Sequence, residues 1–108
     1  MMKKNSILLI GLLVALASTT QAQVWTQIGQ NINGEAAGNF LGTSTSISSN
    51  GSIVAIGAPA NSQNGFNAGH VRIYQNQGGA WTQLGQDIDG EAAYDEFGSA
   101  VSISSDGS

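Results

Sequence analysis

The residues best suited to chemistry are acids gathered in one short stretch, DIDGEAAYDEF, which spans residues 87–97. Carboxylates placed two positions apart around a glycine can converge on one calcium ion. Asp87, Asp89, Glu91 and Asp95 are therefore candidate calcium ligands, with Glu96 beside them. The alternative interpretation is an Asx-rich turn that is exposed to water.

An upstream copy of this stretch favours the turn. Residues 31–41 read NINGEAAGNFL, so asparagine stands at 31, 33 and 39 where the later copy has Asp87, Asp89 and Asp95. The rest of the loop is largely kept, as expected if the backbone geometry matters more than the charge. The sequence therefore predicts no bound cofactor, with calcium as the one ion that the acids suggest.

Histidine occurs once, at position 70, in the segment HVRIYQ. Strand alternation places His70, Arg72 and Tyr74 on one face and Val71 and Ile73 on the other. A catalytic or metal-binding role would need a cysteine, a second histidine or nearby acids, and no such set can be recognised. A Gly-x-Ser-x-Gly elbow and a phosphate-binding loop are also absent from the sequence. We predict a solvated strand histidine and a protein without catalytic residues.

The duplication covers much more than the acidic stretch. Residues 25–52 align without gaps to residues 81–108 at an offset of 56, and 17 of the 28 pairs are identical. Four further pairs exchange asparagine for aspartate, at 31/87, 33/89, 39/95 and 50/106. A fixed period of this order is typical of solenoids, propellers and repeat arrays.

Strand signals recur in a fixed order within the repeat. Strands are predicted at 41–48, 53–59, 70–75 and 80–86, joined by Asn-Gly and Gly-Gly turns and by a loop at 60–69. Segment 53–59, IVAIGAP, is apolar on both faces and should be covered on both sides. Segment 97–104 repeats the first strand, with Val101 and Ile103 on its covered face, and 41–48 shows the same alternation more weakly.

This order predicts an all-β protein built of antiparallel four-stranded blades of a β-propeller. Residues 41–86 would form one complete blade, and residues 97–108 would begin the next. Residues 24–30 would be the last strand of another blade. The sequence thus holds about one and a half repeats, and since a ring needs about four to eight blades we expect the native chain to continue past Ser108.

The order of short motifs resembles the FG-GAP repeat family, the blades of the integrin α-chain β-propeller and of secreted bacterial relatives. The matching residues are Phe97-Gly98, Leu41-Gly42, Gly57-Ala58-Pro59 and the strand GHVRIY at 69–74. The resemblance implies a propeller that serves in extracellular adhesion or ligand binding. Calcium-binding members carry a D-x-D-x-D-G loop, whereas this sequence has only SNGS at 49–52 and SDGS at 105–108. Those calcium sites are therefore not carried over to these turns.

Residues 1–22 are predicted to be a helical signal peptide. Two lysines precede the apolar run 7–17, and small residues precede Gln23. We therefore expect a secreted or cell-surface protein, and its lack of cysteine means that it forms no disulfides.

The expected function is that of a secreted, non-catalytic module that binds an extracellular protein or glycan. The alternatives are the scaffold portion of a larger secreted hydrolase or lyase and a purely structural surface module. Residues 23–108 contain one basic residue, Arg72, against seven acids, so nucleic acid is not an expected partner. Membrane insertion is not expected after signal cleavage, and the isolated fragment should self-associate through open sheet edges.

Overall fold

The computed structural model describes residues 23–108, so the predicted signal peptide lies outside the described residues. These residues form five strands and no helix: β1 (Ser44–Ile47), β2 (Ile53–Ala58), β3 (His70–Gln77), β4 (Ala80–Gln83) and β5 (Ile88–Asp89). No segment of this part of the chain forms a helix of the length and hydropathy that a bilayer crossing requires.

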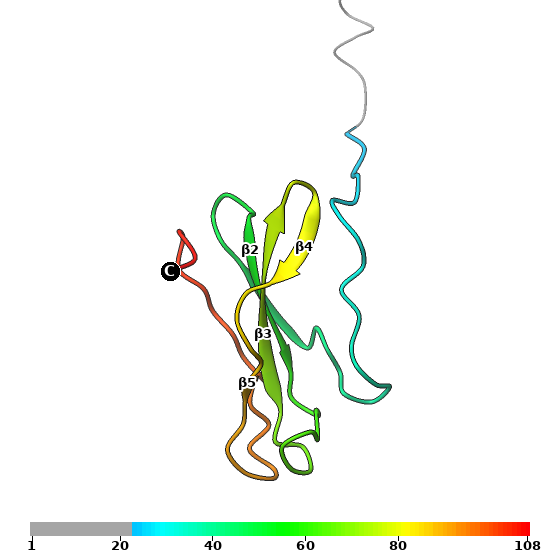
Figure 1. The fold of residues 1–108 in the computed structure, drawn as a ribbon, viewed down its shortest axis with the longest axis vertical. Helices are drawn as coiled ribbons and strands as arrows, with labels where there is room; N and C mark the ends of the chain where they lie inside the picture. The colour runs from blue at the N-terminus through cyan, green and yellow to red at the C-terminus, as the bar shows by residue number, and fades with distance from the viewer. Residues whose placement is uncertain (1–22) are drawn as a thin grey trace, which may run out of the picture.

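All strand pairs are antiparallel, in the order β1-β2-β3-β4, and β5 also pairs with β3 (Figure 1). The prediction of an all-β chain with a four-stranded antiparallel sheet is confirmed. Both tight turns follow from residues that tolerate positive φ. Gly51 has a φ of 74° between β1 and β2, and Gly78 and Gly79 have φ values of 62° and 90° between β3 and β4.

The predicted fourth strand, 80–86, is shorter than expected because a bulge interrupts it. Gln83 pairs with Tyr74 and Ile88 pairs with Val71, so four residues, 84–87, lie against only two residues of β3. Leu84 N still donates to Ile73 O at 2.7 Å, and Gly85 then turns the backbone with a φ of 70°. The bulge divides the outer strand into β4 and β5, and bulges commonly redirect side chains beside functional sites.

The core lies at the centre of the sheet. Ala55, Ile56 and Ala58 on β2 and Val71 on β3 are buried, together with Ala68 of the preceding loop. Adjacent residues of β2 point to opposite faces, so burial of both Ala55 and Ile56 means that both faces are covered. The prediction that this strand is covered on two sides is confirmed.

One face of the sheet is covered by residues 97–105, which belong to the second copy of the repeat. Ser44 Oγ donates to Gly98 O at 2.7 Å, and Ile103 N donates to Ser46 Oγ at 3.0 Å. Ser49 N donates to Ser105 O at 2.9 Å. Ser44 and Ser46 are paired with Gly57 and Ala55, so this segment lies on the face that these residues share.

The strand predicted at 97–104 does not form. Phe97 makes only an isolated parallel bridge with Gly69, and the residues after it are outside any strand. In the first copy β1 is a strand because it pairs with β2, whereas the described residues hold no second-copy counterpart of Ile53–Ala58. Without a ladder partner the same residue pattern remains an extended segment packed on the sheet.

The N-terminal segment of the first copy contacts the other side of the sheet, next to β4 (Figure 1, cyan). Trp81 Nε1 donates to Ile28 O at 2.9 Å, and the Gln30 amide exchanges hydrogen bonds with the Trp81 backbone at 2.8 and 3.1 Å. Trp81 is paired with Asn76, which is on the His70 face by alternation. The strand predicted at 24–30 is absent, because these contacts involve side chains and not a backbone ladder.

In β1 the residues that are covered lie on the opposite face from the one predicted for the first copy. Ser44 and Ser46 are half-buried, whereas Ile47 is 57% exposed. The serine face is covered because residues 98–103 lie on it, whereas Ile47, on the edge strand β1, stays exposed on the other face. In the second copy Val101 and Ile103 are half-buried, as predicted, because they face the sheet.

The backbone conformation repeats along with the sequence. Residues with positive φ occur at five pairs of positions separated by the repeat offset: 29/85, 38/94, 40/96, 42/98 and 51/107. Gly29, Gly42 and Gly51 are matched by glycine in the second copy. At the other two pairs Gly38 becomes Tyr94 and Phe40 becomes Glu96, with φ still positive. The path of the chain is therefore retained even where the residue type is unfavourable for it.

Candidate functional site

His70 is the first residue of β3 and is only 2% exposed, so the prediction of a solvated histidine is wrong. Its backbone pairs with Asp89 of β5, and the bulge at 84–87 brings Asp87 to the same side. The sequence pattern placed His70 on the expected face with Arg72 and Tyr74. The pattern did not predict β5, whose Asp89 pairs with His70.

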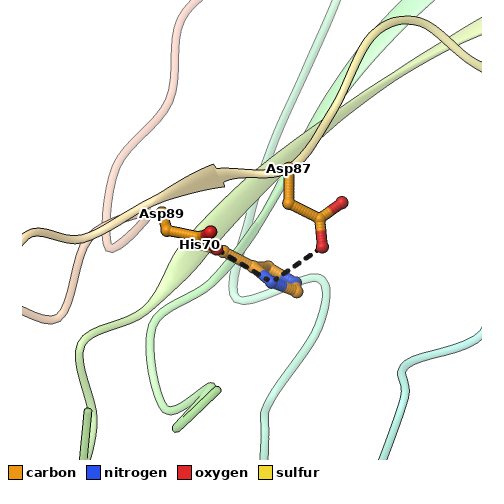
Figure 2. Close-up of side chains that lie close together, drawn as sticks. All are labelled: His70, Asp87 and Asp89. Atoms are coloured by element: carbon orange, nitrogen blue, oxygen red, sulfur yellow. Dashed lines mark ion pairs between the residues drawn. The ribbon is translucent and has the colours of Figure 1, made fainter. Parts of the chain in front are cut away.

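The imidazole of His70 faces two carboxylates (Figure 2). Its Nδ1 lies 3.6 Å from Asp87 Oδ2 and 4.0 Å from Asp89 Oδ1. Both separations exceed the length of an N–H···O hydrogen bond. Within the described residues, Nδ1 of His70 is the one buried side-chain nitrogen or oxygen atom without a hydrogen-bond partner.

Asp87 is held in place by a second network. Arg72 donates to both carboxylate oxygens of Asp87, from Nε and from a terminal nitrogen, at 2.7 Å each. Gln83 Nε2 also donates to Asp87 Oδ1, at 2.7 Å. These donors, led by Arg72, lower the pKa of Asp87 to about 2, against the opposing effect of burial. The hydrogen bond to Asp87 likewise raises the pKa of Arg72, so this pair remains ionised.

Glu35 of the first copy joins the network across the sheet face. It forms an ion pair with Arg72, and Glu35 Oε2 accepts a hydrogen bond from Asn61 Nδ2 at 3.3 Å. Asn61 is itself buried, and its Oδ1 accepts a hydrogen bond from Gln63 N at 3.1 Å. The only arginine of residues 23–108 therefore connects the acidic stretch of the second copy to that of the first.

The four predicted calcium ligands separate into two groups. Asp87 and Asp89 lie with His70 in a cluster whose ligand atoms are within 4.8 Å of one another, and Glu91 and Asp95 are not part of it. Glu91 is exposed, and Asp95 Oδ2 accepts a hydrogen bond from Ala92 N at 2.9 Å, which closes a local turn. Glu96 is exposed with a φ of 50°.

The two Asx turns use their side chains locally. Asn50 Oδ1 accepts hydrogen bonds from Ser48 Oγ, Ser52 N and Ser52 Oγ, at 3.0, 3.0 and 2.7 Å. Asp106 Oδ1 accepts the equivalent three bonds from Ser104 and Ser108, at 2.9, 3.0 and 2.8 Å. The backbone bond from Ser108 is the main cause of a lowered pKa at Asp106.

Sequence reasoning missed the partnership of His70 with Asp87 and Asp89. Aspartates on both sides of Ile88 have the alternation of a short strand, which places both carboxylates on the same face. That alternation was the available signal. No sequence signal marked the bulge that places this strand opposite His70, because Gly85 alone does not specify a register shift.

Comparison of the chain with family models, with curated proteins and with solved structures gave no match.

Proposed function

We propose that the chain is part of an exported FG-GAP-like β-propeller that binds an extracellular protein or glycan without transforming it. The observation that carries this proposal is the packing of the second copy of the repeat against the first. Ser49 and Ser105 are separated by one repeat offset, and both Ser49 N and Ser49 Oγ donate to Ser105 O. Equivalent segments of successive copies thus run side by side, as the inner strands of neighbouring blades do in a propeller.

The side chains of the shared face support this arrangement. Close to residues 97–105 the sheet presents Ser44, Ser46 and Gly57, which are small, while β3 presents the larger Val71 and Ile73. Blades converge toward the axis of a propeller, so small residues suit the inner strands and larger residues the outer strands. The size gradient follows that order.

The residues that resemble the FG and GAP motifs meet in this contact. A Cβ atom on Gly57 would overlap the carbonyl oxygen of Gly98, and a Cβ atom on Gly98 would lie 2.6 Å from His70 O. The two backbones therefore approach as closely as only glycine allows. This gives both motifs one structural role, the packing of successive blades.

A candidate ligand-binding feature lies on the loops at one end of the sheet. Phe66 and Tyr94 form an edge-to-face pair with ring centroids 5.4 Å apart, and both side chains are largely exposed. Exposed aromatic side chains contribute apolar contact area and, in tyrosine, a polar group, which suits both protein and glycan ligands. Tyr94 replaces Gly38 of the first copy and keeps a positive φ of 67°, so this ring is held at a backbone cost.

The test is saturable binding of the purified chain to arrays of extracellular proteins and glycans. Tyr94→Gly restores the residue of the first copy, relieves the positive φ and removes one ring, so it should abolish binding without lowering stability. Trp25→Ala, which removes an aromatic side chain that is 94% exposed elsewhere, is the matched control and should leave binding unchanged.

Two results would overturn the proposal. Cleavage or another chemical change of the bound ligand would indicate the scaffold of a secreted enzyme. Absence of any saturable ligand would indicate a purely structural surface module. Export is tested separately, by the loss of residues 1–22 from protein recovered outside the cell.

A further inference from the structure

The buried nitrogen of His70 lacks a partner although two acceptors face it. Nδ1 points toward Asp87 and Asp89, but both oxygens lie beyond hydrogen-bond distance. A buried polar atom without a partner lowers stability unless something else satisfies it. A cation that binds imidazole nitrogen and carboxylate oxygen at the same time would satisfy it.

We propose that His70, Asp87 and Asp89 bind one divalent cation of the zinc class. One nitrogen and two carboxylate oxygens lie within 4.8 Å of one another, and both carboxylates are turned toward the imidazole (Figure 2). Zinc binds imidazole nitrogen and carboxylate oxygen at about 2.0–2.2 Å, so the ligand atoms of a tetrahedral ion lie about 3.3–3.6 Å apart. Nδ1 lies 3.6 Å from Asp87 Oδ2, within this range, and 4.0 Å from Asp89 Oδ1, so zinc binding would draw the Asp89 carboxylate slightly inward. Water would supply the fourth ligand.

Charge favours a divalent cation at this position. Asp87, Asp89 and Glu35 carry three negative charges, and within residues 23–108 Arg72, paired with Asp87 and Glu35, is the one arginine or lysine. With His70 neutral, as a metal ligand must be, the acids exceed the bases by two. A divalent ion restores neutrality.

Arg72 and Gln83 orient the Asp87 carboxylate without filling all of its hydrogen-bond acceptor positions. Asp87 Oδ1 accepts from both of them, whereas Oδ2 accepts only from Arg72 and is the oxygen nearer to His70. Each carboxylate oxygen can accept two bonds, so Oδ2 retains one position for a metal. Hydrogen bonds of this kind fix the orientation of a ligand in many metal sites.

Calcium does not fit the same atoms. It takes six to eight oxygen ligands, and this cluster offers one nitrogen and two carboxylates. Glu91 and Asp95, which would enlarge the oxygen set, lie outside the cluster. Imidazole instead suits zinc and its neighbours among the first-row metals. The site is independent of the propeller proposal, since its three ligands come from one sheet.

The first experiment is calorimetric titration of the untagged, chelator-treated chain with zinc chloride and, separately, with calcium chloride. We expect one zinc ion per chain, bound at least tenfold more tightly than calcium. Asp89→Asn should weaken zinc binding at least tenfold. Asp95→Asn is the matched control, because it makes the same charge change in the same stretch and should leave zinc binding unchanged.

A second measurement identifies the ligand atom directly. The chain has one histidine, so its ¹⁵N spectrum contains the two nitrogen signals of a single imidazole. Zinc should shift the Nδ1 signal in the parent chain and in Asp95→Asn, and not in Asp89→Asn. The proposal would be overturned by equal zinc affinity in the two variants, by zinc affinity no greater than that for calcium, or by an Nδ1 signal that zinc does not move. A shift of the Nδ1 signal that appears only on acidification would also overturn it, because it would indicate a metal-free imidazolium between the two carboxylates.

Discussion

The two copies of the repeat have nearly the same sequence and the same turns, yet only the first contains a strand at its start. Ser44–Ile47 forms β1, whereas residues 100–103 remain outside any strand. The turns on either side agree in detail: Thr43 N donates to Phe40 O at 3.1 Å, and Ser99 N donates to Glu96 O at 3.2 Å. The difference shows that local residues determine the turns and that a strand also needs a partner.

Equivalent residues of the two copies also differ in burial. Trp81 is half-buried in β4 against Ile28 and Gln30, whereas Trp25, its counterpart, is 94% exposed. Ile103 packs on the first sheet, whereas Ile47 is exposed. The burial of these residues therefore depends on the neighbouring copy, and matched substitutions at equivalent positions measure that dependence.

The largest difference is expected between Gly98→Ala and Gly42→Ala. Both glycines have the same backbone strain for alanine, with φ values of 92° and 93°, which costs about 1–2 kcal/mol. Only at Gly98 would the new methyl group meet backbone atoms, and overpacking of this kind adds about 2 kcal/mol. Urea unfolding at neutral pH gives both free energies of unfolding. Equal losses would show that the copies do not pack through Gly98.

An intermediate difference is expected between Asp87→Asn and Asp95→Asn, each of which introduces the residue of the first copy. Asp87→Asn leaves Arg72 with Glu35 alone and should cost about 1–2 kcal/mol, reduced by the partial exposure of the pair. Asp95 accepts only a local backbone bond, which asparagine can also accept, so its substitution should cost less than about 0.5 kcal/mol. Thermal unfolding in the presence of a chelator compares them; a greater loss for Asp95→Asn would contradict the assigned network.

The smallest effect is expected at the Asx turns and depends on pH. The pKa of Asp106 is lowered from its ordinary value of 3.8, so the carboxylate adds stability above that value and loses it as the pH falls through the lowered pKa. Asp106→Asn, which reproduces Asn50, should remove this dependence. Unfolding of both chains at about pH 6 and about pH 3 tests it; a parent chain that gains stability relative to Asp106→Asn on acidification would reverse the assigned direction.

The antiparallel meander was predictable because its signals are local. Asn50-Gly51 and Gly78-Gly79 specify tight turns, and the apolar run 53–58 specifies a strand covered on both faces. The register of β5 was not predictable. Its two residues pair with the start of β3 only because residues 84–87 bulge, and the sequence marks that bulge with a single glycine.

The candidate site was predictable only in part for the same reason. The acidic stretch identified Asp87 and Asp89, but the pattern grouped them with their sequence neighbours Glu91 and Asp95. Spatial neighbours proved to be His70 and Arg72, which are separated from Asp87 by 17 and 15 positions. Long-range pairing across a bulge decides the membership of this cluster.

The contact between Gly57 and Gly98 has a consequence for how such a chain can evolve. It consists of backbone atoms and serine oxygens, so no pair of large side chains has to change together when one copy is exchanged for another. Unequal recombination at the repeat offset would insert or delete a whole unit and create the same glycine contact at the new junction. The number of units in such a gene should therefore vary more readily than the two glycine positions within each unit.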